Sequence, residues 1–284
     1  MNNLHTVKGW EIHHKDHLQY RTTGSPTIHL KFYQYSSYRQ RVTILQAPQE
    51  CKLKKQGINN FFIFHKKVNA RGSIILDRKI RIEPIVAKIS HDTDWGKISA
   101  ISQDERAKYH ESSQYWATQS PLLKDIIGNK AFLEDDLKQW VKFSSNFVVG
   151  TITTRENQET RLGAHVAAKE GIGDCDEFTD LFITLTRIRG IPSRRLTGYH
   201  ISEGGNSVEA HAWAEIYSPV VSWIPIDLAM NNIGTYSQNY VIWKIEEFNP
   251  ALSDYQIRIK HSNAVHHEWF RNDPVITPIL MSDS

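Results

Sequence analysis

The sequence predicts an α+β protein in which a β-rich N-terminal part precedes a part that mixes helices and strands. Short segments with alternating apolar residues fill roughly the first 90 positions. An apolar stripe with helical spacing runs over residues 175–188, and two β-type segments follow it at residues 208–217 and 223–228. Strands followed by helices and then by further strands are typical of this class.

The N-terminal part shows the spacing of short antiparallel strands. Ile28, Leu30 and Phe32 alternate with polar residues, as do the apolar residues of 42–44 and 80–82. Glycine, proline and asparagine separate these segments, a pattern typical of an antiparallel sheet or a small sandwich. We therefore expect residues 1–95 to form an N-terminal β-rich domain.

A polar stretch at residues 90–96 marks the expected boundary. Beyond it, an apolar stripe predicts a helix over 133–148, and small apolar residues predict a short helix near 164–168. Strands are expected at 240–245 and 255–259, and the tail from residue 274 to 284 as an extended edge. We expect residues 96–284 to form one domain that includes these C-terminal strands.

Cys175 stands at the head of the most clearly amphipathic helix. Gly190 and Pro192 end this helix, and Asp174 precedes it as a candidate N-cap. Free backbone N–H groups and the helix dipole favour a thiolate in the first turn, and the same N–H groups can bind an oxyanion. Its apolar face consists of Phe178, Leu181, Phe182, Leu185 and Ile188.

Two interpretations of this cysteine compete. A buried structural thiol is the commoner role for an isolated cysteine. A nucleophile is favoured by the flanking glycines and the helix start, although the acidic side chains of Asp176 and Glu177 raise the local negative potential. A cationic partner is therefore needed to favour the thiolate.

The two β-type segments supply a base and an orienting acid. His211 lies in the first segment and Asp227 in the second, with Pro219 between them. A hairpin centred on Pro219 would place His211 directly opposite Asp227, about 5 Å apart at Cβ. A thiol, an imidazole and a carboxylate in this order are the parts of a nucleophilic triad.

Two tryptophans share the strand faces of the expected base and acid. Trp213 is two residues from His211, and Trp223 is four residues from Asp227. Side chains at such even spacings point to the same face of a strand. We expect at least one indole to shield the His–Asp pair from water, the alternative being that both pack beneath the sheet.

These blocks resemble the transglutaminase-like superfamily. The resemblance covers roughly residues 100 to 245 and is carried by four blocks in order: Gly-Asp-Cys-Asp-Glu-Phe at 173–178, Arg-Ile-Arg-Gly-Ile-Pro-Ser-Arg at 187–194 with Gly198-Tyr199, His-Ala-Trp-Ala-Glu-Ile-Tyr at 211–217, and Trp-Ile-Pro-Ile-Asp at 223–227. It implies a papain-like α+β core and a catalytic triad of Cys175, His211 and Asp227. Trp140, Asn146 and Phe147 are candidates for the upstream residue that completes the oxyanion hole in this family.

The resemblance implies acyl transfer through a thioester intermediate. Water as the acceptor gives a cysteine peptidase or amidase, whereas an amine gives a transglutaminase or a natural-product amide synthase. We favour the hydrolase slightly, since the acceptor depends on how well the site excludes water. A catalytically silent scaffold of the same fold is the alternative from another class. The substrate is expected to be a peptide, a protein or an acyl thioester.

Composition limits the other functions. A net charge of +3 is too small to indicate nucleic-acid binding, and no apolar stretch is long enough to span a bilayer. With only two cysteines, the chain is not expected to hold a disulfide framework. The first residues lack an apolar signal core, so a cytoplasmic location is expected. The oligomeric state is left open.

No cofactor or metal is expected. An aspartate-rich calcium loop is absent from the sequence, so calcium dependence is not expected. The fourteen histidines include two groups, at residues 13–17 and 266–267, but neither is joined by cysteine or carboxylates at zinc-like spacing. We interpret these histidines as facing solvent.

Overall fold

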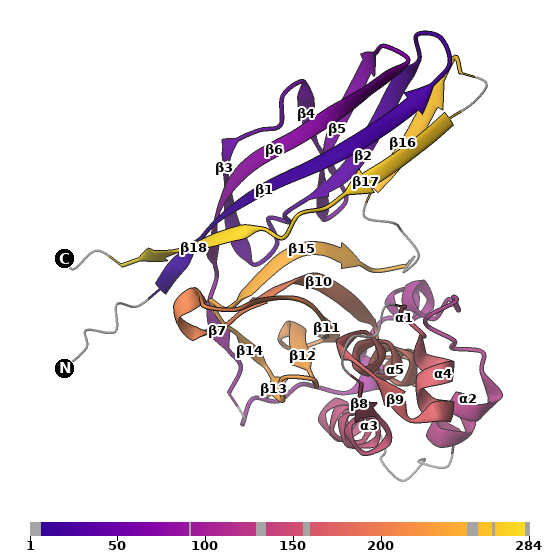
Figure 1. Ribbon diagram of the computed structural model, residues 1–284. Helices are drawn as coiled ribbons and strands as arrows, with labels where there is room; N and C mark the ends of the chain where they lie inside the picture. The colour runs from indigo at the N-terminus through magenta and orange to yellow at the C-terminus, as the bar shows by residue number, and fades with distance from the viewer. Residues whose placement is uncertain are drawn as a thin grey trace.

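The protein consists of a β-sandwich stacked on a unit of helices and strands (Figure 1). The structure, a computed structural model, describes residues 7–90, 92–128, 135–155, 160–248, 255–262 and 265–281. The predicted α+β class with a β-rich N-terminal region is confirmed. Both ends of the described chain lie on the same side of the sandwich (Figure 1).

Two antiparallel sheets form the sandwich. In the first, β17, β1, β6 and β3 are neighbours in that order and β18 also pairs with β1; in the second, the order is β16-β2-β5-β4. Apolar side chains from both sheets pack between them, including Leu18, Leu30, Phe62 and Leu76. The strands are β1 (Val7–Thr22), β2 (Thr27–Gln34), β3 (Gln40–Gln46), β4 (Cys51–Gln56), β5 (Asn59–Lys67), β6 (Arg71–Pro84), β16 (Tyr255–Lys260), β17 (Val265–Phe270) and β18 (Val275–Leu280).

The C-terminal strands belong to this sandwich, which corrects the expected assignment of residues 255–281 to the second domain. β16 pairs with β2, while β17 and β18 pair with β1. Tyr255 and Trp269 stack with ring centroids 4.5 Å apart, linking the two sheets. Alternation of apolar residues identifies a strand but not its pairing partner. The partner is the strand edge that the rest of the fold leaves open.

Strand β1 was not predicted, because its inward positions are partly polar. Trp10, Ile12 and Leu18 face inward, but so do His14 and Asp16, which breaks the apolar alternation. Contrary to the expectation of solvent-facing histidines, His14 is buried and its Nε2 lies 2.6 Å from the Tyr35 hydroxyl.

A five-stranded antiparallel sheet forms the centre of the second unit. Its order is β13-β12-β11-β10-β15, and a short pairing of β14 with β7 lies beside it. The strands are β7 (Ala87–Lys88), β10 (Ser193–Ile201), β11 (Val208–Ser218), β12 (Ser222–Asp227), β13 (Asn232–Ile233), β14 (Thr235–Tyr236) and β15 (Tyr240–Glu246).

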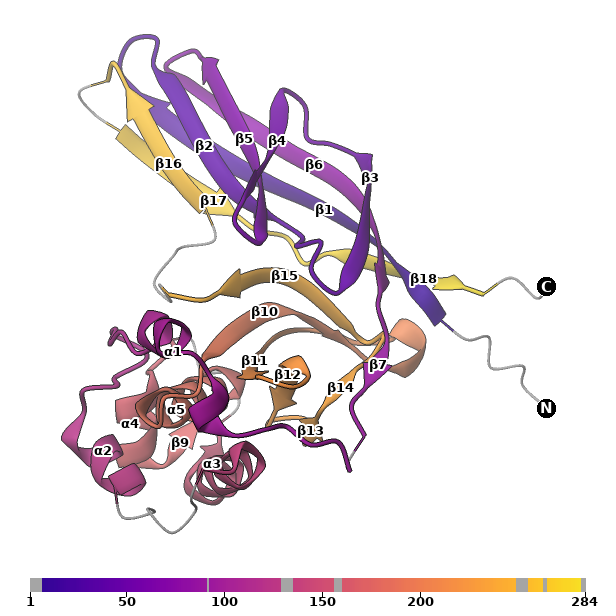
Figure 2. The same ribbon diagram turned by 180° about the vertical axis from the view of Figure 1, so that it is seen from behind.

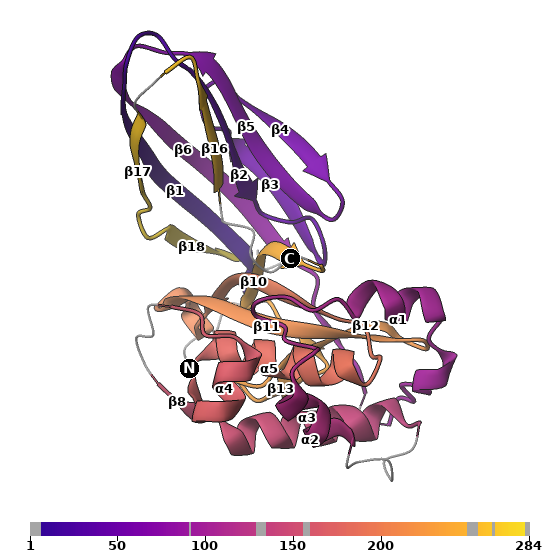
Figure 3. The ribbon, with the colours of Figure 1, turned by 90° about the vertical axis from the view of Figure 1, so that its right-hand side faces the viewer.

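Helices cover the face of this sheet that points away from the sandwich (Figure 3). Helix α5 is the central one, and its Leu181 and Phe182 pack in one core with Ile216 of β11. The helical elements are η1 (Ile98–Ala100), α1 (Gln103–Tyr109), α2 (Pro121–Gly128), α3 (Leu137–Thr151), α4 (Ala164–Glu170), α5 (Cys175–Ile188) and η3 (Glu203–Gly205). Two short strands, β8 (Thr153–Thr154) and β9 (Ile172–Gly173), pair in parallel.

Helix α3 starts later than predicted. Asp136 caps it by accepting the Gln139 N–H at 2.9 Å, so the helix begins at Leu137. Residues 133 and 134 of the predicted helix lie outside the described residues. No helix in the described part of the chain is long and apolar enough to cross a membrane.

Two side-chain amides form hydrogen bonds across the junction between the two units. β15 is the edge strand that faces the sandwich (Figure 2). Gln40 accepts the Ile242 N–H at 2.9 Å and donates to the Ile242 carbonyl at 2.6 Å. Asn59 makes the same pair of bonds with Ile245, at 2.9 and 2.7 Å. The two amides thus replace a neighbouring strand along part of this edge.

Candidate active site

The start of helix α5 is held by a reciprocal cap. Asp174 accepts the Asp176 N–H at 2.8 Å, and Glu177 accepts the Asp174 N–H at 3.2 Å. A Cβ added at Gly173 would lie 2.3 Å from the Glu177 Cβ, so only glycine fits before this cap. Cys175 is therefore fixed as the first residue of the helix, and its side chain is half-buried.

His211 and Asp227 are in direct contact. Nε2 of His211 lies 2.7 Å from Oδ2 of Asp227, and both side chains are buried. Asp227 also accepts the Met230 N–H through Oδ1 at 3.1 Å. With Nε2 engaged by the carboxylate, Nδ1 is the ring nitrogen left for a third group.

The hairpin register that we predicted for this pair is wrong by two residues. Ser218 pairs with Ser222, so the turn is centred on Val220 rather than Pro219. The Ser218 hydroxyl accepts the N–H groups of Val220 and Val221, and Ser222 has a φ of 67°. A shift of two keeps every side chain on its face, and diagonal neighbours remain within reach of one another.

The Cys175 thiol acts on the His211 imidazole through charge and hydrogen bonding, although the two residues come from different elements. Burial acts to lower the pKa of His211, but hydrogen bonds to Asp227 and Cys175 and the charges of both groups outweigh it and raise that pKa to about 10. The cationic imidazolium is therefore the favoured form at neutral pH. It supplies the positive charge that a thiolate at this position needs.

The neighbouring acids Asp176 and Glu177 are held by contacts of their own. Asp176 forms an ion pair with the buried guanidinium of Arg195. Burial acts to raise the pKa of Asp176, but the charge and hydrogen bonding of Arg195 lower it below the usual value. Glu177 is buried and accepts the Leu162 N–H at 2.7 Å. The negative potential that the sequence suggested at the thiol is thus reduced by Arg195.

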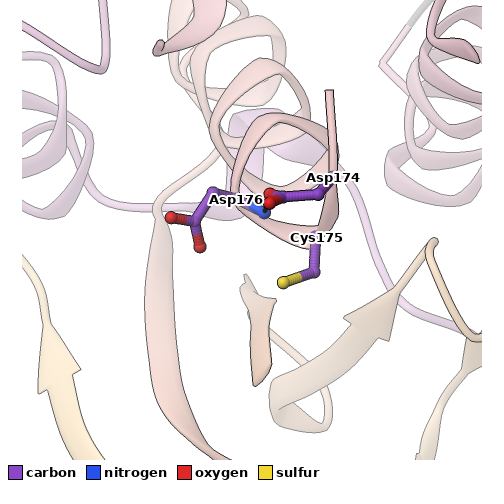
Figure 4. A group of neighbouring side chains, drawn as sticks. All are labelled: Asp174, Cys175 and Asp176. Carbon is purple, nitrogen blue, oxygen red and sulfur yellow. Dashed lines mark hydrogen bonds between the residues drawn. The ribbon is translucent and has the colours of Figure 1, made fainter. Parts of the chain in front are cut away.

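Asp174, Cys175 and Asp176 bring three possible metal-ligand atoms within 4.8 Å of one another (Figure 4). Figure 4 shows the Cys175 sulfur projecting from the first turn of the helix, below the Asp174 and Asp176 side chains. One carboxylate caps the helix and the other pairs with Arg195. These contacts account for both acids without a metal ion.

Aromatic side chains enclose the His–Asp pair. Trp213 stacks on His211 with centroids 5.9 Å apart, which confirms the expected shielding for this indole. Trp223 instead packs against Arg194, whose guanidinium carbon lies 3.8 Å from the ring centroid. Arg194 also pairs with Glu215, so this acid on the strand of His211 is already engaged.

Sequence reasoning missed the part played by Tyr240. Its hydroxyl donates to Oδ2 of Asp227 at 2.7 Å, and its ring packs edge-on against Trp213. The sequence indicated only that Tyr240 begins a strand. His200 packs against both Tyr240 and the base, with its ring centroid 5.1 Å from Tyr240 and 5.9 Å from His211.

The three candidates for the upstream oxyanion residue all lie on α3, and their positions along this helix distinguish between them. Trp140 is buried against Phe143 and lies within 5.0 Å of the Arg189 guanidinium, at the C-cap of α5. Helix α5 has 14 residues and so spans about 21 Å, which places Trp140 far from Cys175. The C-terminal end of α3 leads into β8, beside β9 and the start of α5, so Asn146 and Phe147 are the candidates that remain.

Comparison with known proteins agrees with this geometry. Residues 129–228 match the model of the transglutaminase-like superfamily. The matched segment is transglutaminase-like and includes all three residues of the Cys–His–Asp arrangement.

A structure from Cytophaga hutchinsonii, named as a candidate cysteine protease, is similar over nearly the whole chain. The TM-score is 0.58 with 17% identity, covering 96% of this chain and 94% of that one. At this identity the likeness shows a shared fold, sandwich included. The periplasmic domain of TgpA from Pseudomonas aeruginosa has a TM-score of 0.40 with 13% identity, covering 80% of this chain and 91% of that one.

A curated relative is the uncharacterized protein YebA of Bacillus subtilis. It is 25% identical over 117 residues, which is 37% of this chain and 14% of that protein. The chain thus matches only about a seventh of the length of this relative.

Proposed function

We propose that the protein catalyses thiol-dependent acyl transfer as a cysteine peptidase or amidase, with Cys175, His211 and Asp227 as its triad. The observation that carries this proposal is the chain of contacts from thiol to imidazole to buried carboxylate. The transglutaminase-like fold supports it at the level of the family.

In this mechanism the Cys175 proton resides on His211, whose imidazolium is the favoured form at neutral pH, and the thiolate sulfur attacks the substrate carbonyl carbon. The carbonyl oxygen becomes an oxyanion near the Cys175 N–H at the start of α5, because the next two N–H groups of the helix donate to the Asp174 cap. Collapse of this intermediate breaks the C–N bond, and the imidazolium returns the proton to the departing amine. Water, losing a proton to His211, then hydrolyses the thioester and restores the thiol.

Hydrolysis is favoured over amide formation by the exposure of the nucleophile. The Cys175 side chain is half-buried rather than enclosed, so water can reach a thioester formed on it. An amine acceptor would need a site that excludes water more fully. Amide-bond formation is therefore the second candidate.

Alkylation by iodoacetamide at pH 7 tests the proposal, with Cys51 as the internal control. Burial raises the pKa of Cys51 to about 12, so this thiol should react slowly. We expect Cys175 to react at least about 100-fold faster, since thiolates are the reactive form. Cys175→Ala should abolish turnover of a chromogenic amide while the fold is retained. Equally slow alkylation of both thiols, or turnover by the variant, would contradict the proposal.

We also propose the cytoplasm as the place of action. Both cysteines are free thiols, and a reducing compartment would keep them so. Fractionation of cells that produce the full-length protein tests this, and recovery from an oxidising compartment would argue against it.

A further inference from the structure

Negative charge gathers around the Cys175 sulfur. A carboxylate oxygen of Asp174, one of Asp176 and the sulfur all lie within 4.8 Å of one another (Figure 4). Like charges this close disfavour a thiolate. The imidazolium of His211 offers one positive charge, but the Asp227 carboxylate in contact with it carries the opposite charge. A thiolate at this position therefore needs a further counter-charge.

Arg195 on β10 brings a positive charge to this turn of α5. Its guanidinium pairs with Asp176, and it also lies 3.1 Å from Glu246 and 3.6 Å from Asp180. Glu177, the other acid of the turn, accepts backbone N–H groups instead. The Arg195 side chain is only 5% exposed, so its charge is screened by salt much less than that of a surface arginine.

Two further cations lie in this region, but each is paired with another acid. Arg161 pairs with Asp180 at 2.5 Å, and Nζ of Lys244 lies 3.5 Å from Glu246. Both cations also act to lower the pKa of the acid that follows the thiol, but less than Arg195 does. Arg195 is therefore the main counter-charge of that acid.

A purely structural role is the alternative for this ion pair. Loss of one partner of any buried pair leaves an uncompensated charge and destabilises the fold. The buried pair of Arg78 with Asp16 in the sandwich is of this kind. The Arg195 pair differs because its acid, Asp176, lies within 4.8 Å of the Cys175 sulfur. At such a distance, the charge of either partner affects the protonation of the thiol.

We propose that Arg195 is a positioning residue of the active site, which acts through Asp176 and keeps Cys175 in its reactive thiolate form. The guanidinium offsets the charge of the acid beside the sulfur, so that the imidazolium of His211 is left to stabilise the thiolate. This inference rests on the proposed acyl-transfer function and deepens it, because it names the group that allows an acid to lie beside the nucleophile.

The pH profile of Cys175 alkylation by iodoacetamide tests this role, with the modified peptide followed by mass spectrometry. Removal of a positive charge should raise the pH at which the rate reaches half of its plateau. Arg195→Gln keeps N–H donors for the acids but loses the charge, so we expect this midpoint to rise by about 1 pH unit. Alkylation below the midpoint should then be about tenfold slower, while the plateau rate stays the same.

Asp176→Asn should shift the midpoint in the opposite direction, down by about 1 pH unit, because it removes a negative charge. The double variant Arg195→Gln/Asp176→Asn loses one charge of each sign and should return to within about 0.3 pH unit of the unmodified protein. Arg195→Lys keeps the charge and should also stay close to it. Since the Asp176 side chain is 31% exposed, Asp176→Asn tests the charge even if Arg195→Gln fails to fold.

Arg78→Gln is the matched control, because it breaks a buried ion pair in the sandwich. It should lower stability in urea unfolding without moving the midpoint. An unshifted midpoint in Arg195→Gln or in Asp176→Asn would overturn the proposal. A rate reduced equally at every pH in Arg195→Gln, and not restored in the double variant, would also overturn it and leave Arg195 a structural role alone.

The unmodified protein separates this inference from the proposed function. Fast alkylation of Cys175 with the same midpoint in every variant would remove the role of Arg195 and leave the triad. Alkylation of Cys175 as slow as that of Cys51 in every protein would remove the triad, and the role of Arg195 with it.

Discussion

At the residue scale, Asp227 is the most constrained group of the site. Oδ2 receives both the imidazole of His211 and the hydroxyl of Tyr240, and Oδ1 receives the Met230 N–H. A buried carboxylate with three donors is held in one orientation. The orientation of the proposed base therefore depends on this acid.

Asp227→Asn should lower the pKa of His211 from about 10 to near or below its ordinary value of 6.5, because burial then acts without the opposing carboxylate. A raised pKa means that the charged pair stabilises the fold fully below pH 6.5 and loses this effect as the pH rises through about 10. NMR titration of the imidazole measures the shift. Turnover should fall by about three orders of magnitude.

The pH dependence of the unfolding free energy of Asp227→Asn is a second test of the charged pair. Urea unfolding should show the largest loss relative to the parent protein at pH 6 and little loss above pH 10. A constant difference across this range would show that the carboxylate does not hold the imidazolium.

Tyr240→Phe should lower kcat about tenfold and leave KM nearly unchanged, since the lost hydrogen bond positions Asp227 rather than the substrate. Loss of this bond should also cost about 1 kcal/mol of stability. Steady-state kinetics with a chromogenic amide measure the first effect. Tyr255→Phe, in the sandwich, is the control that should leave kcat unaltered, and a rise in KM alone would contradict the positioning role.

At the scale of elements, the start of α5 places the thiol. Asp174→Ala removes the cap and should cost about 1 kcal/mol in urea unfolding. It should also change the alkylation rate of Cys175, because the first turn of the helix loosens. Asp136→Ala removes the equivalent cap of α3 and is the matched control. It should lose similar stability without changing the reactivity of Cys175, and a change in both variants would mean that the effect is global.

Hairpin β11–β12 shows why a predicted register that is wrong by two residues can still place the correct side chains together. Its turn is set by the Ser218 hydroxyl and by the positive φ of Ser222, neither of which is visible in apolar alternation. Because the actual register differs by two residues, His211 and Asp227 keep a common face. A difference of one residue would have separated them.

At the scale of the whole molecule, the sandwich and the unit of helices and strands are joined along β15. Gln40→Met keeps the side-chain volume but leaves the Ile242 N–H without its partner and the Ile242 carbonyl with only the Ser36 N–H at 3.3 Å. A buried unpaired group of this kind costs about 1–3 kcal/mol, so we expect a loss of about 1–3 kcal/mol in urea unfolding. Gln19→Met, at an exposed position of β1, should cost nothing measurable. Equal stability of the two variants would show that the amide does not secure the junction.

The sequence by itself determined those features that depend on local pattern. Helix α5, the Asp174 cap and the strands of His211 and Asp227 follow from spacing and capping preferences, which act within a few residues. The resemblance of four short blocks then indicated the family, which the matched model supports.

Only the tertiary structure decided which distant segments meet. The sandwich takes up the C-terminal strands, Arg195 neutralises Asp176, and Tyr240 holds Asp227. Each is a contact between segments that are separated along the chain or whose pairing no local pattern records. Such contacts follow from how the elements pack, because strand edges and buried charges accept any partner that the completed fold brings to them.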